Sequence, residues 1–264
     1  MMARAAVAQG VTVMACTPHI LPGVYHNHGP DIRIATKALQ DALDREEIPL
    51  QLATGADVHM APNFVAGLRS GEFLTLADSR YVLVEPPHHV APPQLEYFCF
   101  NLVTAGYVPV LTHPERLSWI ESRYDTIKKL VRTGVWMQVT AGSFTGAFGR
   151  TALVQRLLDE GCVHLIASDA HDAERRPPDL ASGREAVEKR VGAQEAEYLV
   201  FTRPMGILKD QPPSSLPGPS RGADADGESA EMPEQSQMRG RPDLGRHGAH
   251  GVRGFSDRLR RLFR

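Results

Sequence analysis

The sequence predicts an α/β protein in which helices cover a set of parallel strands. Short β-branched apolar runs alternate with stretches of helical spacing, and this alternation is typical of parallel strands joined by crossover helices. Glycine recurs between a helical stretch and the next strand, where a left-handed helix C-cap favours it, at Gly10, Gly106, Gly134 and Gly161. Metal-ligating side chains follow directly after several strands, at the end where barrel folds carry their sites.

The individual elements follow from these runs. We expect strands over residues 11–15, 50–53, 81–84, 108–111, 136–139 and 164–167. We expect helices over residues 32–45, 93–105, 125–132 and 151–160.

Composition excludes several classes of protein. A chain of 264 residues suffices for one large α/β domain, and a net charge of -2 gives no global footprint for nucleic acid. The three cysteines form no C-x-x-C pair, which argues against a disulfide framework and against a zinc ribbon. The sequence shows no signal peptide and no apolar run of membrane-spanning length, so a cytoplasmic protein is expected. No oligomeric state is predicted.

The chain changes character near residue 210. Residues 1–210 are predicted to fold, whereas residues 211–250 are rich in Pro, Gly, Ser and charge and lack aromatics, which predicts a disordered linker. In the basic tail, residues 251–264, apolar side chains share one helical face opposite arginines. This tail is either a helix that docks on the inner face of the membrane or on a protein, or a short, mostly unfolded segment.

Three strand ends carry the chemistry. The phrase Ser168-Asp169-Ala170-His171 follows the strand at 164–167, Thr17-Pro18-His19 follows the strand at 11–15, and His113 follows the strand at 108–111. Two further carboxylates, Asp57 and Glu85, also stand at strand ends. The candidate metal ligands are therefore His19, Asp57, Glu85, His113, Asp169 and His171. Taken singly, each is explained equally well by a capped loop, a strand exit or a turn.

Nitrogen and oxygen ligands without thiolate favour a hydrolytic Mn, Fe or Zn site over a structural zinc. Two ions about 3.5–4 Å apart can activate water and hold the oxygens of a substrate. Arg116 and Arg176 are the natural holders of a phosphate, because a guanidinium donates two parallel hydrogen bonds to its oxygens. The alternative for each is a solvated surface arginine. The remaining histidines are interpreted as loop or surface residues: His26, His28, His59, His88, His89 and His164, with His247 and His250 in the linker.

Together these motifs resemble the PHP-domain (polymerase and histidinol phosphatase) metallophosphoesterases. More narrowly, they are similar to the bacterial manganese-dependent protein-tyrosine phosphatases of capsule and exopolysaccharide operons. The resemblance covers residues 1–210 and is carried by Thr17-Pro18-His19, by residues 74–81, by the run 106–116 with His113-Pro114-Glu115-Arg116, by residues 138–143, and by Ala167-Ser168-Asp169-Ala170-His171.

The resemblance implies a distorted seven-stranded β/α barrel that holds two or three divalent ions, most often Mn²⁺, with Zn²⁺ or Fe as alternatives. It implies the six ligands named above, Arg116 and Arg176 as phosphate contacts, and Asp169 or His171 in proton transfer. The implied substrate is the phosphotyrosine tail of a bacterial kinase that controls polysaccharide export.

Two departures qualify the resemblance. The family usually carries Glu where Asp57 stands. It also opens with a strand bearing Asp-x-His-x-His and a loop with another Asp ligand, whereas residues 1–10 resemble the helix that follows. We count six strands where the family has seven, and an N-terminally truncated relative is expected, with a crippled relative as the alternative.

The sequence therefore predicts a metal-dependent protein-tyrosine phosphatase. The alternatives are a small-molecule phosphatase, such as one acting on histidinol phosphate, and an impaired regulator that binds phosphopeptide without turnover. Cysteine-based tyrosine phosphatases are excluded by spacing, since they place Arg six positions after Cys. Here those positions, after Cys16, Cys99 and Cys162, hold Pro22, Ala105 and Ser168.

Overall fold

The computed structural model describes residues 1–220, and every pairing between its strands is parallel. One sheet has six strands in the order β2-β4-β5-β6-β7-β8, and a second consists of β1 and β3. The predicted α/β class with parallel strands is thus confirmed. The strands are β1 (Val13–Cys16), β2 (His19–Ile20), β3 (Gln51–Thr54), β4 (Asp57–His59), β5 (Tyr81–Glu85), β6 (Val108–Thr112), β7 (Trp136–Thr140) and β8 (Leu165–Ala167).

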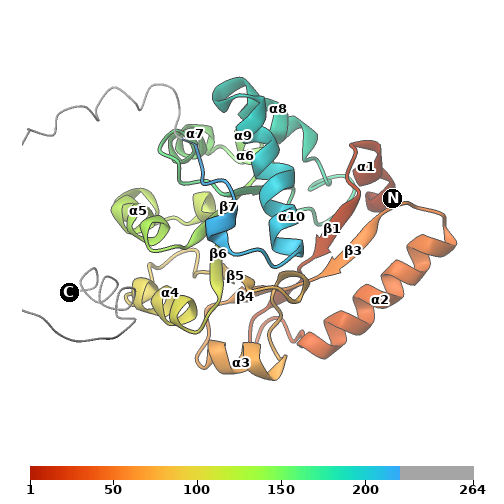
Figure 1. Cartoon of the computed structure of the whole chain (residues 1–264), viewed down its shortest axis with the longest axis horizontal. Coiled ribbons are helices and arrows are strands. Elements are labelled where there is room, and N and C mark those ends of the chain that lie inside the picture. The colour runs from red at the N-terminus through yellow and green to blue at the C-terminus, as the bar shows by residue number, and fades with distance from the viewer. Residues whose placement is uncertain (221–264) are drawn as a thin grey trace, which may run out of the picture. The chain divides into compact units, whose positions relative to one another are not determined.

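Helices follow most of the strands and lie outside them (Figure 1). The α-helices are α1 (Met2–Ala8), α2 (Gly29–Arg45), α3 (Phe64–Ser70), α4 (Leu95–Thr104), α5 (Tyr124–Arg132), α6 (Ala141–Phe144), α7 (Thr151–Asp159), α8 (Ala181–Val191), α9 (Ala193–Glu197) and α10 (Arg203–Leu208). Short helical turns complete the described chain: η1 (Leu76–Asp78), η2 (Pro114–Arg116), η3 (Glu121–Arg123), η4 (Tyr198–Thr202) and η5 (Pro213–Ser215). Within residues 1–220, no helix is both long and apolar enough to cross a bilayer.

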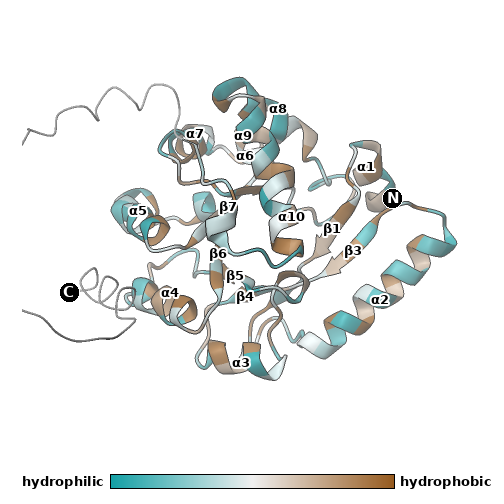
Figure 2. Cartoon of the chain, viewed as in Figure 1, coloured by the Kyte–Doolittle hydropathy of each residue, from teal (hydrophilic) through white to brown (hydrophobic). Residues whose placement is uncertain are grey.

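The core forms around the middle strands. Every residue of β5 and β6 is buried, as expected for parallel strands that are covered on both faces. The helix α5 buries Tyr124, Ile127 and Leu130 at helical spacing, and this face joins Met137 and Val139 of β7 in one apolar cluster. In Figure 2 the helices carry both apolar and polar residues, consistent with one buried face and one exposed face.

Two strands were not predicted. Each of β2 and β4 has only two or three residues, too few to show a periodic pattern. Each continues an earlier strand after a two-residue break, at Thr17-Pro18 in one case and Gly55-Ala56 in the other. Proline has no N–H for the ladder, and a Cβ at Gly55 would come within 2.9 Å of the Leu76 side chain. After each break, the chain leaves the small sheet and enters the six-stranded sheet.

The packed chain continues past the predicted boundary at residue 210. Arg203 is fully buried, and its guanidinium donates to the carbonyl oxygens of Pro217 and Gly218 while it pairs with buried Glu195. Leu216 packs on the apolar cluster that contains Tyr81 and Trp136. Residues 211–220, assigned from the sequence to a disordered linker, are therefore held on the domain. The rest of that linker and the basic tail at 251–264 lie outside the described residues.

His164 is a second correction, because it is buried rather than a loop or surface residue. Its ring stacks on Trp136, and its Nδ1 accepts a hydrogen bond from the Met137 N–H at 3.2 Å. Burial lowers the pKa of His164 to about 3 from 6.5.

We expect His164 to make the fold sensitive to acid. Below pH 6.5 the unfolded chain binds a proton at this ring that the folded chain does not bind. The free energy of unfolding should therefore fall as pH drops from 6.5 toward 3, by at most about 1.4 kcal/mol per pH unit from this group. His164→Asn keeps an acceptor for the Met137 N–H and should flatten the slope by that amount. Denaturant unfolding of both proteins between pH 7 and pH 5 measures it, and equal slopes would contradict the assignment.

Loss of Arg203 should be costly. Arg203→Met leaves Glu195 buried without its partner, so the free energy of unfolding should drop by about 3–5 kcal/mol. Arg80→Met is the matched control, because the Arg80–Asp210 pair is exposed and its loss should change the free energy of unfolding far less. Chemical unfolding of the two variants compares them. A similar drop in the free energy of unfolding in both variants would show that burial of the Arg203–Glu195 pair does not add to its contribution to stability.

Candidate metal centre

Four imidazoles converge on the carboxylate of Glu85, the last residue of β5. This side chain is 3 % exposed. One oxygen, Oε2, lies 2.9 Å from His19 Nδ1 and 2.6 Å from His59 Nε2. The other, Oε1, lies 2.8 Å from His88 Nε2 and 3.5 Å from His113 Nε2. Such a convergence of nitrogen and oxygen donors is typical of a site for divalent cations.

Strand register brings these side chains together. In the six-stranded sheet His19 pairs with Asp57 and His59 pairs with Glu85, while His113 follows β6 directly. Adjacent parallel strands place register partners side by side and end at the same edge of the sheet. Residues far apart in the sequence are thus neighbours because four consecutive strands, β2, β4, β5 and β6, end together.

The donor atoms form two groups that share Glu85. His19, His59 and Glu85 offer atoms within 4.8 Å of one another, as do Glu85, His88 and His113. His19 Nδ1, His59 Nε2 and Glu85 Oε2 are buried, yet in the described part of the chain none makes a well-directed hydrogen bond. These nitrogen and oxygen atoms lie close together without forming hydrogen bonds to one another. A cation that all of them bind would explain this arrangement better than a hydrogen-bond network.

Asp57 lies between the two groups. Its Oδ2 is 3.8 Å from His19 Nδ1 and 3.8 Å from His113 Nε2, and Thr112 donates a hydrogen bond to its Oδ1 at 3.2 Å. Burial, followed by the charge of Glu85, raises the pKa of Asp57 to about 8. Burial also acts to raise the pKa of Glu85, but His19 and His59 hold it below its usual range. Two buried carboxylates repel each other, and a cation between them would remove that cost.

Both predicted arginines lie beside this centre. Arg116 Nη2 is 2.7 Å from Asp169 Oδ2, and Arg176 donates to the same oxygen. Arg116 also donates to Thr140 Oγ1 at 3.2 Å. The Nε atoms of Arg116 and Arg176 are buried and have no hydrogen-bond partner among residues 1–220. Unused guanidinium donors in a buried position favour binding of an anion.

Glu115 fixes the segment that carries Arg116. Its side chain is completely buried, and its Oε1 accepts hydrogen bonds from the Thr140 N–H and the Ser143 hydroxyl, both at 3.0 Å. These bonds tie η2, after β6, to the end of β7 and the start of α6. Arg116 is thereby placed next to Thr140.

Three of the predicted ligands, Asp57, Asp169 and His171, belong to neither of the two groups around Glu85. Asp57 lies 3.8 Å from His19 and from His113, whereas Asp169 and His171 stand further out. His171 is half-exposed, its Nδ1 lies 3.0 Å from the Asp169 carbonyl oxygen, and its ring is 6.2 Å from the ring of His19. The charge of Asp169 nevertheless acts on His19 and Asp57. Asp169 and His171 thus border the same site from the end of β8.

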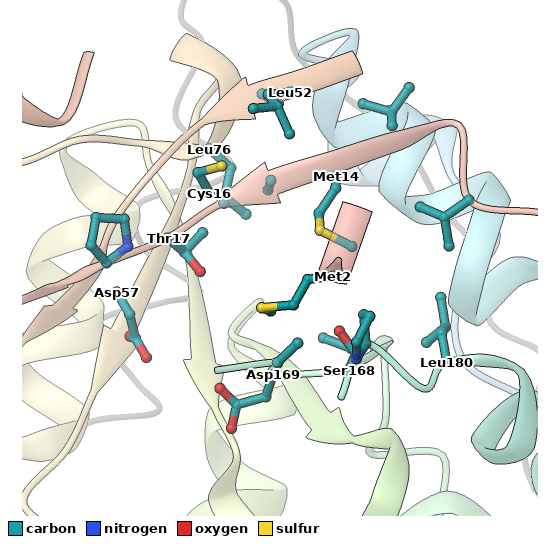
Figure 3. A pocket seen from close by; sticks show the side chains of 18 of the residues that line it. Met2, Met14, Cys16, Thr17, Leu52, Asp57, Leu76, Ser168, Asp169 and Leu180 are labelled. Atoms are coloured by element: carbon teal, nitrogen blue, oxygen red, sulfur yellow. The ribbon is translucent and has the colours of Figure 1, made fainter. Parts of the chain in front are cut away.

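A cavity of about 1000 Å³ adjoins the centre and is lined by His19, Asp57, His113, Asp169 and His171. Figure 3 shows Asp57 and Asp169 on one side of it and the apolar side chains of Met14 and Leu180 on another. The cavity is also lined by residues of β1 and β8. Within the described chain, β1 pairs only with β3 and β8 only with β7.

Sequence reasoning missed His59 and His88, which it assigned to loops or the surface. His59 belongs to β4, and its side chain is largely buried against Glu85. The signal was present, because Asp57-Val58-His59 has the same Asp-x-His spacing as Asp169-Ala170-His171. His88 stands three residues after Glu85, and its Nε2 forms a hydrogen bond with Glu85 Oε1. This contact depends on the conformation of the loop between them, which the sequence pattern does not show.

Comparisons with known proteins agree with this geometry. The model of the family described as "Capsular polysaccharide synthesis, CpsB/CapC" matches residues 1–209. Tyrosine-protein phosphatase YwqE of Bacillus subtilis is 34% identical over 212 residues, which cover 80% of this chain and 83% of YwqE. Tyrosine-protein phosphatase CpsB of Streptococcus pneumoniae is 28% identical over 212 residues, 77% of this chain and 86% of CpsB.

The fold has a solved counterpart as well. A structure from the work titled "Crystal structures of YwqE from Bacillus subtilis and CpsB from Streptococcus pneumoniae, unique metal-dependent tyrosine phosphatases" superposes with a TM-score of 0.78. Its sequence identity is 32%, and the match covers 84% of this chain and 90% of the other. The chain therefore belongs to the CpsB/CapC family of capsular polysaccharide synthesis proteins.

Proposed function

We propose that this protein is a metal-dependent protein-tyrosine phosphatase that hydrolyses phosphotyrosine on a polysaccharide-export tyrosine kinase and so regulates capsule or exopolysaccharide synthesis. The observation that carries the proposal is the position of two arginines, with unused buried Nε donors, directly beside the histidine cluster on Glu85. The relatives named above are tyrosine-protein phosphatases, and the solved structures are described as metal-dependent.

The same likeness supports the finer description of the fold. The parallel strands, with candidate metal ligands in β2, β4 and β5 and after β5, β6 and β8, fit a distorted β/α barrel of the PHP type.

Two or three divalent ions fit the donors, and we propose Mn²⁺, with Zn²⁺ or Fe as alternatives. One ion would be held by His19, His59 and Glu85, and another by Glu85, His88 and His113. Asp57 reaches both groups, and Asp169 and His171 stand at the border. When bound, such ions lower the pKa of water and polarise phosphoryl oxygens.

The protein's own residues would bind and orient the phosphate. Arg116 and Arg176 donate hydrogen bonds to its equatorial oxygens and stabilise the charge that grows on them during in-line attack. The backbone oxygen of Asp169 accepts a hydrogen bond from His171 Nδ1–H. A ring that also carries a proton on Nε2 would deliver that proton to the departing tyrosyl oxygen and become neutral. No covalent step on cysteine is needed, and burial raises the pKa of Cys16, the cysteine that lines the cavity.

The substrate partner would be a phosphorylated kinase tail at the inner face of the membrane. On this proposal the protein would act in the cytoplasm. Contact of the basic tail, residues 251–264, with the membrane or with the partner remains a prediction, since that tail lies outside the described residues.

Metal analysis tests the newly found ligands. His59→Ala and His88→Ala each remove a donor from one group, so the affinity for Mn²⁺ should fall by about 10-fold or more. His28→Ala is the matched control, because His28 is exposed and pairs only with Glu72 among the acidic residues of the described chain. Titration calorimetry with Mn²⁺ measures the three affinities. Unchanged affinity in both site variants would remove His59 and His88 from the centre.

Turnover tests the activity itself. With Mn²⁺ present, the wild-type protein should release phosphate from a phosphotyrosyl peptide, and His113→Ala should abolish this release. Arg176→Met should lower kcat/KM by about 100-fold or more, as expected for a donor to developing charge.

Two other results would refute this assignment. Tight binding of the phosphopeptide without turnover in the wild-type protein would identify a regulator. Turnover of histidinol phosphate in preference to the peptide would identify a small-molecule phosphatase.

A further inference from the structure

A phenyl ring stands on the loop between α6 and α7, next to Arg116. Phe148 is 39 % exposed. The loop leaves the carboxyl end of β7 through α6, so it lies at the edge of the sheet where the metal centre forms. Gly146 and Gly149 flank the ring with φ of 88° and 66°, a backbone conformation that other residues rarely adopt.

The ring is held from two directions. The guanidinium carbon of Arg116 lies 4.7 Å from its centroid, a cation–π contact. The ring also packs against α6, where a Cβ on Gly142 would come within 2.9 Å of Phe148 Cε2. Phe148 is therefore positioned before any ligand binds, and its exposed part faces solvent beside Arg116.

This contact places the ring beside the donors of Arg116. The Phe148 ring lies against the guanidinium. Of the guanidinium nitrogens, Nη2 is engaged by Asp169 and Thr140, whereas the buried Nε has no partner among the described residues. An anion that pairs with Arg116 would therefore have Phe148 as a neighbour.

We propose that Phe148 is a specificity-determining residue that packs against the aryl ring of a phosphate ester held by Arg116, and so favours aryl over alkyl phosphates. This rests on the proposed function and goes further, because it names the side chain that distinguishes phosphotyrosine from phosphoserine or a sugar phosphate. An aryl ring gains offset or edge-to-face contact with Phe148, whereas an alkyl ester offers no such surface.

Binding of two non-hydrolysable probes tests the proposal without turnover. In saturating Mn²⁺, calorimetry should show phenylphosphonate binding more tightly than methylphosphonate to the wild-type protein. Phe148→Ala should narrow the ratio of the two Kd values by about 2- to 10-fold, the range expected for one aromatic pair, because it weakens binding of phenylphosphonate more than binding of methylphosphonate. Phe201→Ala is the matched control, since Phe201 is 55 % exposed and lies on η4.

Two further variants separate recognition from support of Arg116. Phe148→Tyr keeps the ring and should keep the preference. Gly142→Ala leaves Phe148 in the sequence but displaces it, and should reduce the preference as Phe148→Ala does. Equal weakening of both probes by Phe148→Ala would show that the ring only supports Arg116, and would overturn the proposal.

An unchanged ratio in Phe148→Ala, or a wild-type protein with no preference for phenylphosphonate, would overturn it as well. Turnover of the phosphotyrosyl peptide by the wild-type protein tests the proposed function and does not depend on the role of Phe148. Failure of the proposed function is thus distinguishable from failure of this inference.

Discussion

The structure depends on one buried carboxylate. Glu85 ends a strand whose every residue is buried, and its two oxygens meet four imidazoles from β2, β4 and the segments after β5 and β6. An ionised carboxylate in such a place is costly unless it is paired, so these contacts are a condition of the fold as well as of the chemistry. The same requirement makes the cluster a candidate site for cations, because positive charge would relieve the burial of Glu85 and Asp57.

The interruption of two strands makes this convergence possible. Without the breaks at Thr17-Pro18 and Gly55-Ala56, the chain would continue along the small β1–β3 sheet. After the breaks, His19 and His59 stand at register positions of the six-stranded sheet, beside Glu85. A proline and a glycine, which contribute no ligand atoms, therefore decide which side chains share the metal centre.

The candidate anion site shares one residue with the candidate metal centre. Glu115 anchors the turn that carries Arg116, Asp169 and Thr140 contact its guanidinium, and the Phe148 ring lies against it. Asp169, itself a candidate metal ligand, links the arginines to the histidine cluster. Phe148 offers no ligand atom, so a substitution there leaves the metal-binding side chains in place.

The sequence by itself determined the α/β class, the parallel strands and the family resemblance. It also determined which strand ends carry the candidate metal ligands. It could do so because the alternation of short apolar runs with helical spacing, and fixed motifs such as His113-Pro114-Glu115-Arg116, are local signals. Only the tertiary structure decided that His59 and His88 contact Glu85, that His164 is buried, and that Arg203 holds residues 217–218 on the domain. These outcomes depend on register between strands of two or three residues and on contacts across long stretches of chain, which no local pattern encodes.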